Sequence, residues 1–217
     1  MIRVVFFLCL TLTIVAACLL RKRRYLFSLG ISFAVAAAII IGGIGGTYIL
    51  GYVESGSWGA ISYYGSVFAI PILMLPLARL FGVRYLQLMD YCTSSGCIAI
   101  TVGKLFCKIQ GCCGGRVIGY HSNGMEIIFP SQIVEMLYGL VLLAVFLFLE
   151  KKQKLRSIFY PLFLILYGGG RFILNYFRET KSWLGALPTG NVWSIVAILI
   201  GCFWLFNVKI FIINRSE

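Results

Sequence analysis

Seven long apolar runs, separated by short polar segments, limit how this chain can fold. A helix needs roughly 20 mainly apolar residues to cross about 30 Å of hydrocarbon. Hydrophobic residues make up 60% of the 217 and charged residues 12%, against about 45–50% and about 25% in a soluble domain. The sequence therefore predicts an all-α, polytopic integral membrane protein and excludes a soluble domain, a disordered chain and a disulfide-rich secreted miniprotein. The predicted spans cover about 4–20, 26–50, 60–81, 87–108, 132–149, 157–177 and 192–213.

Basic residues set the predicted orientation of these spans. The chain carries 19 Lys and Arg against 7 Asp and Glu, a formal net charge of +12. A basic excess can indicate nucleic acid, but here it occurs in clusters between apolar runs, which is typical of cytoplasmic membrane ends. We therefore expect no nucleic-acid partner, an N-terminus outside and a C-terminus in the cytoplasm. The residues expected on the cytoplasmic side are Arg21, Lys22, Arg23, Arg24, Arg79, Arg84, Lys151, Lys152, Lys154, Arg156, Lys209 and Arg215.

The N-terminal run has an alternative interpretation, a cleaved lipoprotein signal. The stretch 15–18 ends in Cys18 and fits such a signal, and Arg3 precedes an apolar run. The basic cluster that follows Cys18 resists translocation, so we expect a retained first helix. Because no long linker or soluble segment occurs, we expect one transmembrane domain over residues 1–217.

Ionisable residues inside the predicted spans mark a candidate functional site. Such residues are costly in hydrocarbon and usually face a cavity or a partner. Lys104 and Lys108 share a helix face near the outer end of the fourth span, although either could extend to the headgroups. Arg171, Asn175 and Arg178 form a polar stripe on the sixth span. Two inward cations, Lys104 and Arg171, predict a cavity for an anionic phospholipid, because Arg donates paired hydrogen bonds to phosphate.

The start of the fifth span adds further polar groups. Pro130 favours a turn into the helix, and Ser131 and Gln132 can satisfy its open N–H groups. Glu135 lies inside the membrane edge and needs a cation, for which Lys104 or Arg171 is the natural partner.

Two aromatic residues have open interpretations. Tyr64, at the start of the third span, could hydrogen-bond a headgroup or belong to an interfacial aromatic belt. His121 is the single histidine and lies in a predicted outer loop, where solvation is expected more than catalysis.

Four stretches resemble the bacterial prolipoprotein diacylglyceryl transferase family. They lie within about residues 57–180, in the family's order and with similar spacing, and seven spans with an outward N-terminus also match. The pair FPSQxxE and YGxxRFxxxxxR is a fairly specific combination. The stretches are SWGAISYYGSVFA (57–69), GKLFCKIQGCCGGR (103–116), FPSQIVE (129–135) and YGGGRFILNYFRE (167–179).

Enzymes of this family move diacylglyceryl from phosphatidylglycerol to the lipobox cysteine of a prolipoprotein and release glycerol phosphate. The resemblance implies a multi-pass protein of the bacterial plasma membrane that acts at the outer face. Its implied partners are phosphatidylglycerol or a related anionic phospholipid and a prolipoprotein or other peptide thiol, with no metal or other cofactor. It also implies that Lys104 and Arg171 hold the phosphate, with Tyr64 at the catalytic site. Residues implied to bind substrate are Ser131, Gln132, Glu135, Cys107, Gly111, Cys112, Asn175 and Arg178.

The chain departs from the family at several of these positions. Tyr64 stands where many members have histidine, and Lys104 replaces an arginine, which keeps the charge but loses the bidentate fork. Cys107 replaces an asparagine, and Cys112 and Asn175 each replace a glutamate. The obvious general bases are therefore missing.

Two alternatives to the transferase stay open for this reason. The first is a relative that binds or senses anionic phospholipid without catalysis. The second is thiol redox chemistry at Cys107, Cys112 and Cys113. It is disfavoured because the sequence has neither C-x-x-C spacing nor a thioredoxin-like pattern there, and because a Cys112–Cys113 disulfide would be strained.

Overall fold

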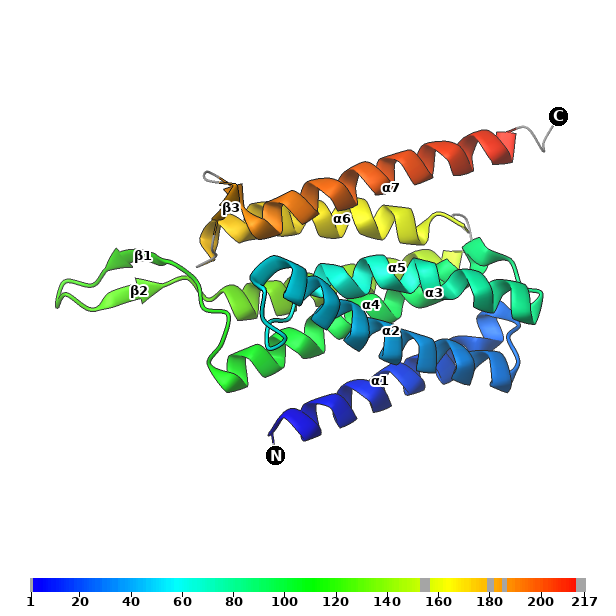
Figure 1. The fold of residues 1–217 in the computed structure, drawn as a ribbon, viewed down its shortest axis with the longest axis horizontal. Coiled ribbons are helices and arrows are strands. Elements are labelled where there is room, and N and C mark those ends of the chain that lie inside the picture. The colour runs from blue at the N-terminus through cyan, green and yellow to red at the C-terminus, as the bar shows by residue number, and fades with distance from the viewer. Residues whose placement is uncertain (1, 153–156, 179–181, 185–186, 214–217) are drawn as a thin grey trace. The chain divides into compact units, whose positions relative to one another are not determined.

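The computed structural model describes residues 2–152, 157–178, 182–184 and 187–213, and most of these residues are helical (Figure 1). Lys154, Arg156 and Arg215, which were predicted to be cytoplasmic, lie outside the described residues. The helices are α1 (Ile2–Tyr25), α2 (Leu29–Ser55), α3 (Tyr63–Phe81), α4 (Tyr85–Gln110), α5 (Ser131–Lys152), α6 (Phe159–Leu174), the 3-10 helix η1 (Asn175–Phe177) and α7 (Thr189–Ile213).

Six of the described helices, namely α1–α5 and α7, have the length and apolar composition of a membrane span. Helix α6 has 16 residues, fewer than the roughly 20 that cross the hydrocarbon. The prediction of an all-α, polytopic membrane protein is therefore confirmed. The seventh span and the orientation of the termini stay predictions.

Two short antiparallel strand pairs connect the helices. Strands β1 (Val117–Tyr120) and β2 (Glu126–Ile128) pair between α4 and α5, and β3 (Ser182–Leu184) pairs with β4 (Leu187–Pro188) before α7. The segment between the predicted fourth and fifth spans thus contains a hairpin, whose turn carries His121.

The chain divides into two compact units. Unit 1 contains Met1–Ala99 and Leu149–Tyr160, and unit 2 contains Ile100–Phe148 and Pro161–Glu217. Helices α4, α5 and α6 therefore contribute residues to both units. A single domain over residues 1–217 stays a prediction.

In unit 1, α2 and α3 approach each other at two glycines. A Cβ added at Gly46 would lie 2.4 Å from the carbonyl oxygen of Gly65, and a Cβ at Gly65 would lie 1.9 Å from that of Gly46. Any larger side chain would push the two backbones apart. Small residues allow membrane helices to approach closely, and Gly46 and Gly65 do so between α2 and α3.

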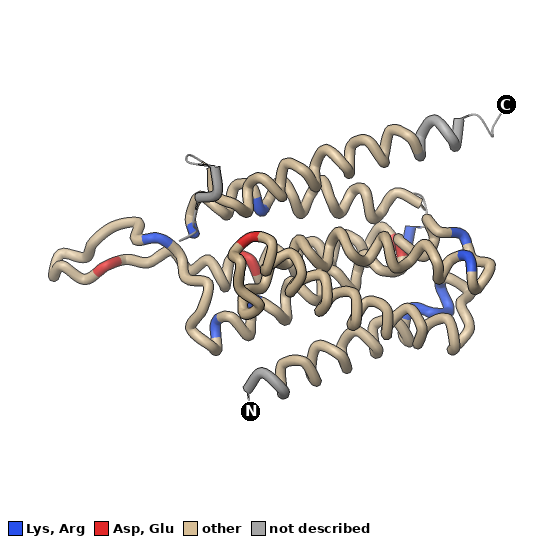
Figure 2. The backbone as a smooth tube through the Cα atoms, in the orientation of Figure 1, with Lys and Arg blue, Asp and Glu red and all other residues tan. Residues whose placement is uncertain are grey.

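The basic residues of unit 1 gather at the helix ends. Helix α1 ends with Lys22, Arg23 and Arg24, and α3 has Arg79 in its last turn. In Figure 2, blue Lys and Arg positions gather at the end of unit 1 where α1 and α3 end. This arrangement supports the prediction that they share one side of the membrane.

In unit 2, two glycines of the 168–170 run serve helix packing. A Cβ at Gly168 would lie 2.9 Å from the carbonyl oxygen of Ser194 on α7. A Cβ at Gly170 would lie 2.3 Å from the ring of Tyr138 on α5, while one at Gly169 would meet nothing within 4 Å. This packing fixes the part of α6 that carries Arg171 against α5.

Candidate functional site

Glu135 is the centre of the candidate site in unit 2. It lies on α5 and is 1% exposed. Its Oε2 lies 2.8 Å from the Nζ of Lys104 on α4 and accepts a hydrogen bond from Nη1 of Arg171 on α6. Its Oε1 lies 3.4 Å from the Nε of Arg178, which follows η1. The predicted pairing of Glu135 is therefore confirmed for both expected cations, and Arg178 joins them.

This group of side chains, the Glu135 cluster, carries surplus positive charge. Three cations around one carboxylate leave a formal charge of +2. Oε1 of Glu135 and Nε of Arg178 are both buried and have no hydrogen-bond partner within the described chain. A buried polar atom without a partner costs about 1–3 kcal/mol. The cluster is therefore suited to a ligand that brings negative charge and both donors and acceptors.

Asn175 lies at the start of η1, between the two arginines of the predicted stripe. Its side chain is fully buried, and neither polar atom of its amide has a hydrogen-bond partner in the part of the chain that the structure describes. Helix α6 ends one residue before Asn175, and the backbone is extended at Arg178. This change of backbone direction brings Arg178 to Glu135. The contact was not predicted, because the sequence pattern treated residues 171–178 as one continuous helix.

Lys104 and Lys108 have different environments although they are one helical turn apart. Lys104 pairs with Glu135, and its side chain is 16% exposed, so it is held within the packed part of unit 2. Lys108 is exposed at the end of α4. The two residues form a natural pair of test and control positions.

Ser131 and Gln132 hold the loop that follows α4. The hydroxyl of Ser131 donates to the carbonyl of Cys113, and the amide of Gln132 donates to the carbonyl of Cys112, each over 2.8 Å. The prediction that these side chains satisfy the open N–H groups of α5 is wrong, because the loop folds back and presents its own carbonyls to them. Substrate binding by Ser131 and Gln132 stays a prediction.

Cys107, Cys112 and Cys113 come together at the C-terminal end of α4. Gly111 has φ 67°, and the N–H of Cys112 donates to the carbonyl of Cys107 over 3.0 Å. The N–H of Gly111 donates to Lys108, which completes a Schellman motif. The motif folds Cys112 back over the last turn, so that the three sulfur atoms lie within 4.8 Å of one another.

The three thiols do not share one acidity. The Cys107 thiol donates a hydrogen bond to the Cys113 sulfur and, together with the charges of Lys104 and Arg178, lowers the pKa of the Cys113 thiol to about 5. Burial and the adjacent Cys113 raise the pKa of the Cys112 thiol. At neutral pH Cys113 is therefore a thiolate next to the cations, and the surplus charge of the cluster stays positive.

Tyr64 lies in unit 1, near the start of α3. It is buried, and its ring stacks on Phe68 with 6.0 Å between ring centroids. The prediction that it takes part in catalysis stays a prediction.

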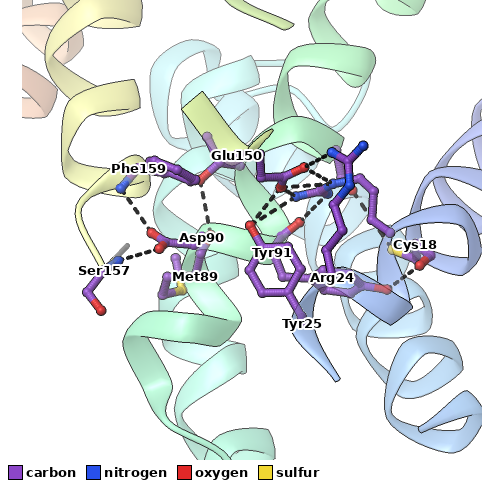
Figure 3. Close-up of polar contacts among 12 residues, drawn as sticks. Cys18, Arg24, Tyr25, Met89, Asp90, Tyr91, Glu150, Ser157 and Phe159 are labelled. Atoms are coloured by element: carbon purple, nitrogen blue, oxygen red, sulfur yellow. Dashed lines mark hydrogen bonds and ion pairs between the residues drawn. The ribbon is translucent and has the colours of Figure 1, made fainter. Parts of the chain in front are cut away.

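Unit 1 contains a second buried charge cluster, centred on Glu150 (Figure 3). Nε of Arg21 lies 3.0 Å and 3.1 Å from the two Glu150 oxygens, and the hydroxyl of Tyr25 donates to Glu150 over 2.6 Å. Arg24 adds an ion pair of 3.2 Å, and Nη1 of Arg21 donates to the carbonyl of Tyr91. The basic cluster predicts only a membrane-end position for Arg21 and does not predict its pairing with Glu150. The detectable signal was Glu150, a carboxylate directly after an apolar run.

Asp90 in unit 1 holds the start of α6. Its carboxylate accepts hydrogen bonds from the backbone N–H groups of Ser157 and Phe159, the second over 2.9 Å (Figure 3). A carboxylate at a helix N-terminus satisfies open donors and complements the helix dipole. Asp90 therefore has a structural role.

Comparison with known proteins matches residues 4–207 to the family described as prolipoprotein diacylglyceryl transferase. A phosphatidylglycerol–prolipoprotein diacylglyceryl transferase of Teredinibacter turnerae is 30% identical over 197 residues, which covers 80% of this chain and 68% of that protein. The protein of that name from Methylobacillus flagellatus is 27% identical and covers 70% of this chain and 62% of its own length. The one from Francisella tularensis subsp. novicida is 28% identical, with shares of 86% and 77%. The chain therefore belongs to the prolipoprotein diacylglyceryl transferase family.

Proposed function

We propose that this protein is a phosphatidylglycerol–prolipoprotein diacylglyceryl transferase of the bacterial plasma membrane. It moves the diacylglyceryl group from the phospholipid to the thiol of a prolipoprotein cysteine at the outer face. The family match covers most of the chain, and the relatives named above carry this activity in their names. The observation in the molecule that carries the proposal is the Glu135 cluster, with three cations on one buried carboxylate.

The unsatisfied atoms of the cluster match the headgroup of phosphatidylglycerol. The phosphate offers acceptor oxygens to Lys104, Arg171 and the buried Nε of Arg178. The terminal glycerol offers hydroxyl donors to Oε1 of Glu135, which lacks a donor. A headgroup that ends in an ammonium group would bring a fourth cation to this cluster, so the charge also favours glycerol over an amine.

The same charges suit the transfer step. The acceptor cysteine attacks as a thiolate on the glyceryl carbon that bears the phosphate ester. A carbon–sulfur bond forms, the carbon–oxygen bond breaks, and its electron pair stays on the phosphate oxygen. The departing glycerol phosphate gains a second negative charge, which the cations Lys104 and Arg171 can stabilise.

The proposed orientation completes the assignment. The N-terminus lies outside, the C-terminus lies in the cytoplasm, and α6 is the seventh span. The basic helix ends of unit 1 (Figure 2) support this arrangement. The ends of α4 and α6 that carry Lys104 and Arg171 then lie near the outer leaflet.

The decisive experiment uses the full chain, produced in cells that lack their own transferase and reconstituted with phosphatidylglycerol. A lipobox peptide should gain the mass of one diacylglyceryl group on its cysteine, with release of glycerol phosphate. Lys104→Ala should abolish the reaction, whereas Lys108→Ala, on the same helix but exposed, should not.

Two outcomes would decide against the proposal. Correctly inserted protein that neither binds phosphatidylglycerol nor modifies the peptide would contradict both the site and the reaction. Saturable phosphatidylglycerol binding that is lost in Lys104→Ala, with no turnover in the wild type, would favour the lipid-binding relative. The non-catalytic function stays under test because Tyr64, Cys112 and Asn175 stand where the family has a histidine or a glutamate that could act as a general base.

A further inference from the structure

We propose that Cys107, Cys112 and Cys113 form a binding site for a soft, thiophilic d10 metal ion of the Zn²⁺ or Cu⁺ class. The site goes beyond the proposed transferase activity, which does not require a metal. It is also chemically separate from the phosphate site, because its ligands are sulfur atoms and not cations. It rests on the geometry of the end of α4 and of the loop that follows.

The spacing of the sulfur atoms is close to that of a three-thiolate metal site. All three lie within 4.8 Å of one another. A Zn–S bond of about 2.3 Å in tetrahedral geometry separates two sulfur ligands by roughly 3.8 Å. No pair therefore has to close by more than roughly 1 Å, a distance that side-chain rotation can provide.

The backbone holds the cysteines in this arrangement without help from a metal. The Schellman motif at Gly111 places Cys112 over Cys107, with an N–H to carbonyl distance of 3.0 Å. Cys113 has φ 58°, a left-handed conformation that L-residues rarely adopt. The side chains of Ser131 and Gln132 bond the carbonyls of Cys113 and Cys112 and keep the loop in place. Such preorganisation is expected of a ligand-binding loop.

The ligand set decides which metals the site can take. Three thiolates without an oxygen ligand select Zn²⁺ or Cu⁺ over Mg²⁺ or Ca²⁺. Three thiolates and a divalent ion together carry a net charge of −1. The neighbouring cations Lys104 and Arg178 offset this charge, because both act on the Cys113 sulfur. A bound ion would link the last turn of α4 to the loop that contacts the start of α5.

The first test titrates metal into reduced, metal-free, full-length protein in detergent. Co²⁺ should bind with one ion per chain, show thiolate-to-cobalt charge-transfer absorption, and be displaced by Zn²⁺. A parallel Cu⁺ titration identifies which ion binds more tightly, and tight binding of either ion at this site supports the proposal. Cys107→Ser, Cys112→Ser and Cys113→Ser should each weaken binding by more than the roughly 10- to 100-fold typical of losing an outer-shell partner. Cys202→Ser, which changes an exposed cysteine on α7, should not.

A second measurement needs no variant and so does not depend on any variant folding. Bound Zn²⁺ or Cu⁺ should protect Cys107, Cys112 and Cys113 of the wild type from alkylation, as read by peptide mass spectrometry. Cys202 should stay reactive. The proposal is overturned if neither ion binds stoichiometrically, or if bound ion leaves the three thiols reactive. It is also overturned if binding survives replacement of all three cysteines by serine.

Discussion

Each unit buries a glutamate beside an arginine, and the two glutamates differ in how completely they are satisfied. In unit 1, both oxygens of Glu150 accept hydrogen bonds, from Arg21, Arg24 and Tyr25. In unit 2, Oε2 of Glu135 carries the short contacts, and Oε1 has an ion pair at 3.4 Å but no hydrogen bond within the described residues.

The two clusters also differ in charge. Glu150 is matched by one buried guanidinium, because Arg21 is buried and the side chain of Arg24 is 42% exposed. Glu135 faces three cations whose side chains are at most 16% exposed. A buried pair that is balanced and hydrogen-bonded serves the fold, whereas uncompensated positive charge in an apolar setting is suited to an anionic ligand.

Glu150→Ala should have the largest effect, and on stability alone. It leaves the buried guanidinium of Arg21 without its carboxylate, which typically costs about 3–5 kcal/mol. The free energy of unfolding in detergent measures this loss, and the transferase activity of the remaining folded protein should be unchanged. Lys151→Ala, at an exposed neighbour, is the control and should change stability by less than about 0.5 kcal/mol. A loss of lipid binding in folded Glu150→Ala protein would contradict the division of roles.

Arg171→Ala should act mainly on the reaction. Removing one preorganised charge donor typically lowers kcat by about 10²–10³, and peptide modification by reconstituted protein measures the loss. Arg171→Lys keeps the charge but not the fork, so it should recover only part of the rate. If Arg171→Ala unfolds the protein as readily as Glu150→Ala does, the Glu135 cluster is structural as well.

Arg178→Gln should weaken phospholipid binding without a matching loss of stability. Its Nε makes only a 3.4 Å ion pair with Glu135, which keeps Lys104 and Arg171 as partners, so the folded protein loses little. A bound phosphate loses a charged hydrogen bond worth about 1.5–3 kcal/mol. Binding of phosphatidylglycerol in micelles, together with the unfolding free energy, separates the two effects. Unchanged lipid affinity would place the headgroup elsewhere.

The smallest effect concerns the ionisation of the Cys113 thiol, on which the charges of Lys104 and Arg178 act. Because the pKa of Cys113 is lowered to about 5, its thiolate is already present above that pH. Alkylation of metal-free protein should therefore be almost independent of pH between about 6 and 8 at Cys113, and should rise with pH at Cys112, whose pKa is raised. Lys104→Ala removes one of the charges, so it should shift the Cys113 profile to higher pH. Parallel profiles for the two cysteines would contradict this assignment.

Local sequence patterns predicted the membrane fold, the family and part of the candidate site. Apolar run length and basic clusters indicated a polytopic helical membrane protein, because the requirement to cross hydrocarbon acts on each segment separately. Glu135 was expected to pair with Lys104 or Arg171, since a buried carboxylate needs a cation and few were available. The spaced motifs within residues 57–180 indicated the family.

Other features depended on contacts that no local pattern contains. The end of α6 before Asn175 directs Arg178 to Glu135, and the fold of the loop after α4 turns Ser131 and Gln132 to its carbonyls. The Arg21–Glu150 pair joins residues 129 positions apart. The sequence by itself determined which residue types had to be buried in a membrane and that each buried charge needed a partner. Tertiary structure decided which partner each charge obtained and which atoms were left unsatisfied, because both depend on backbone direction and long-range packing.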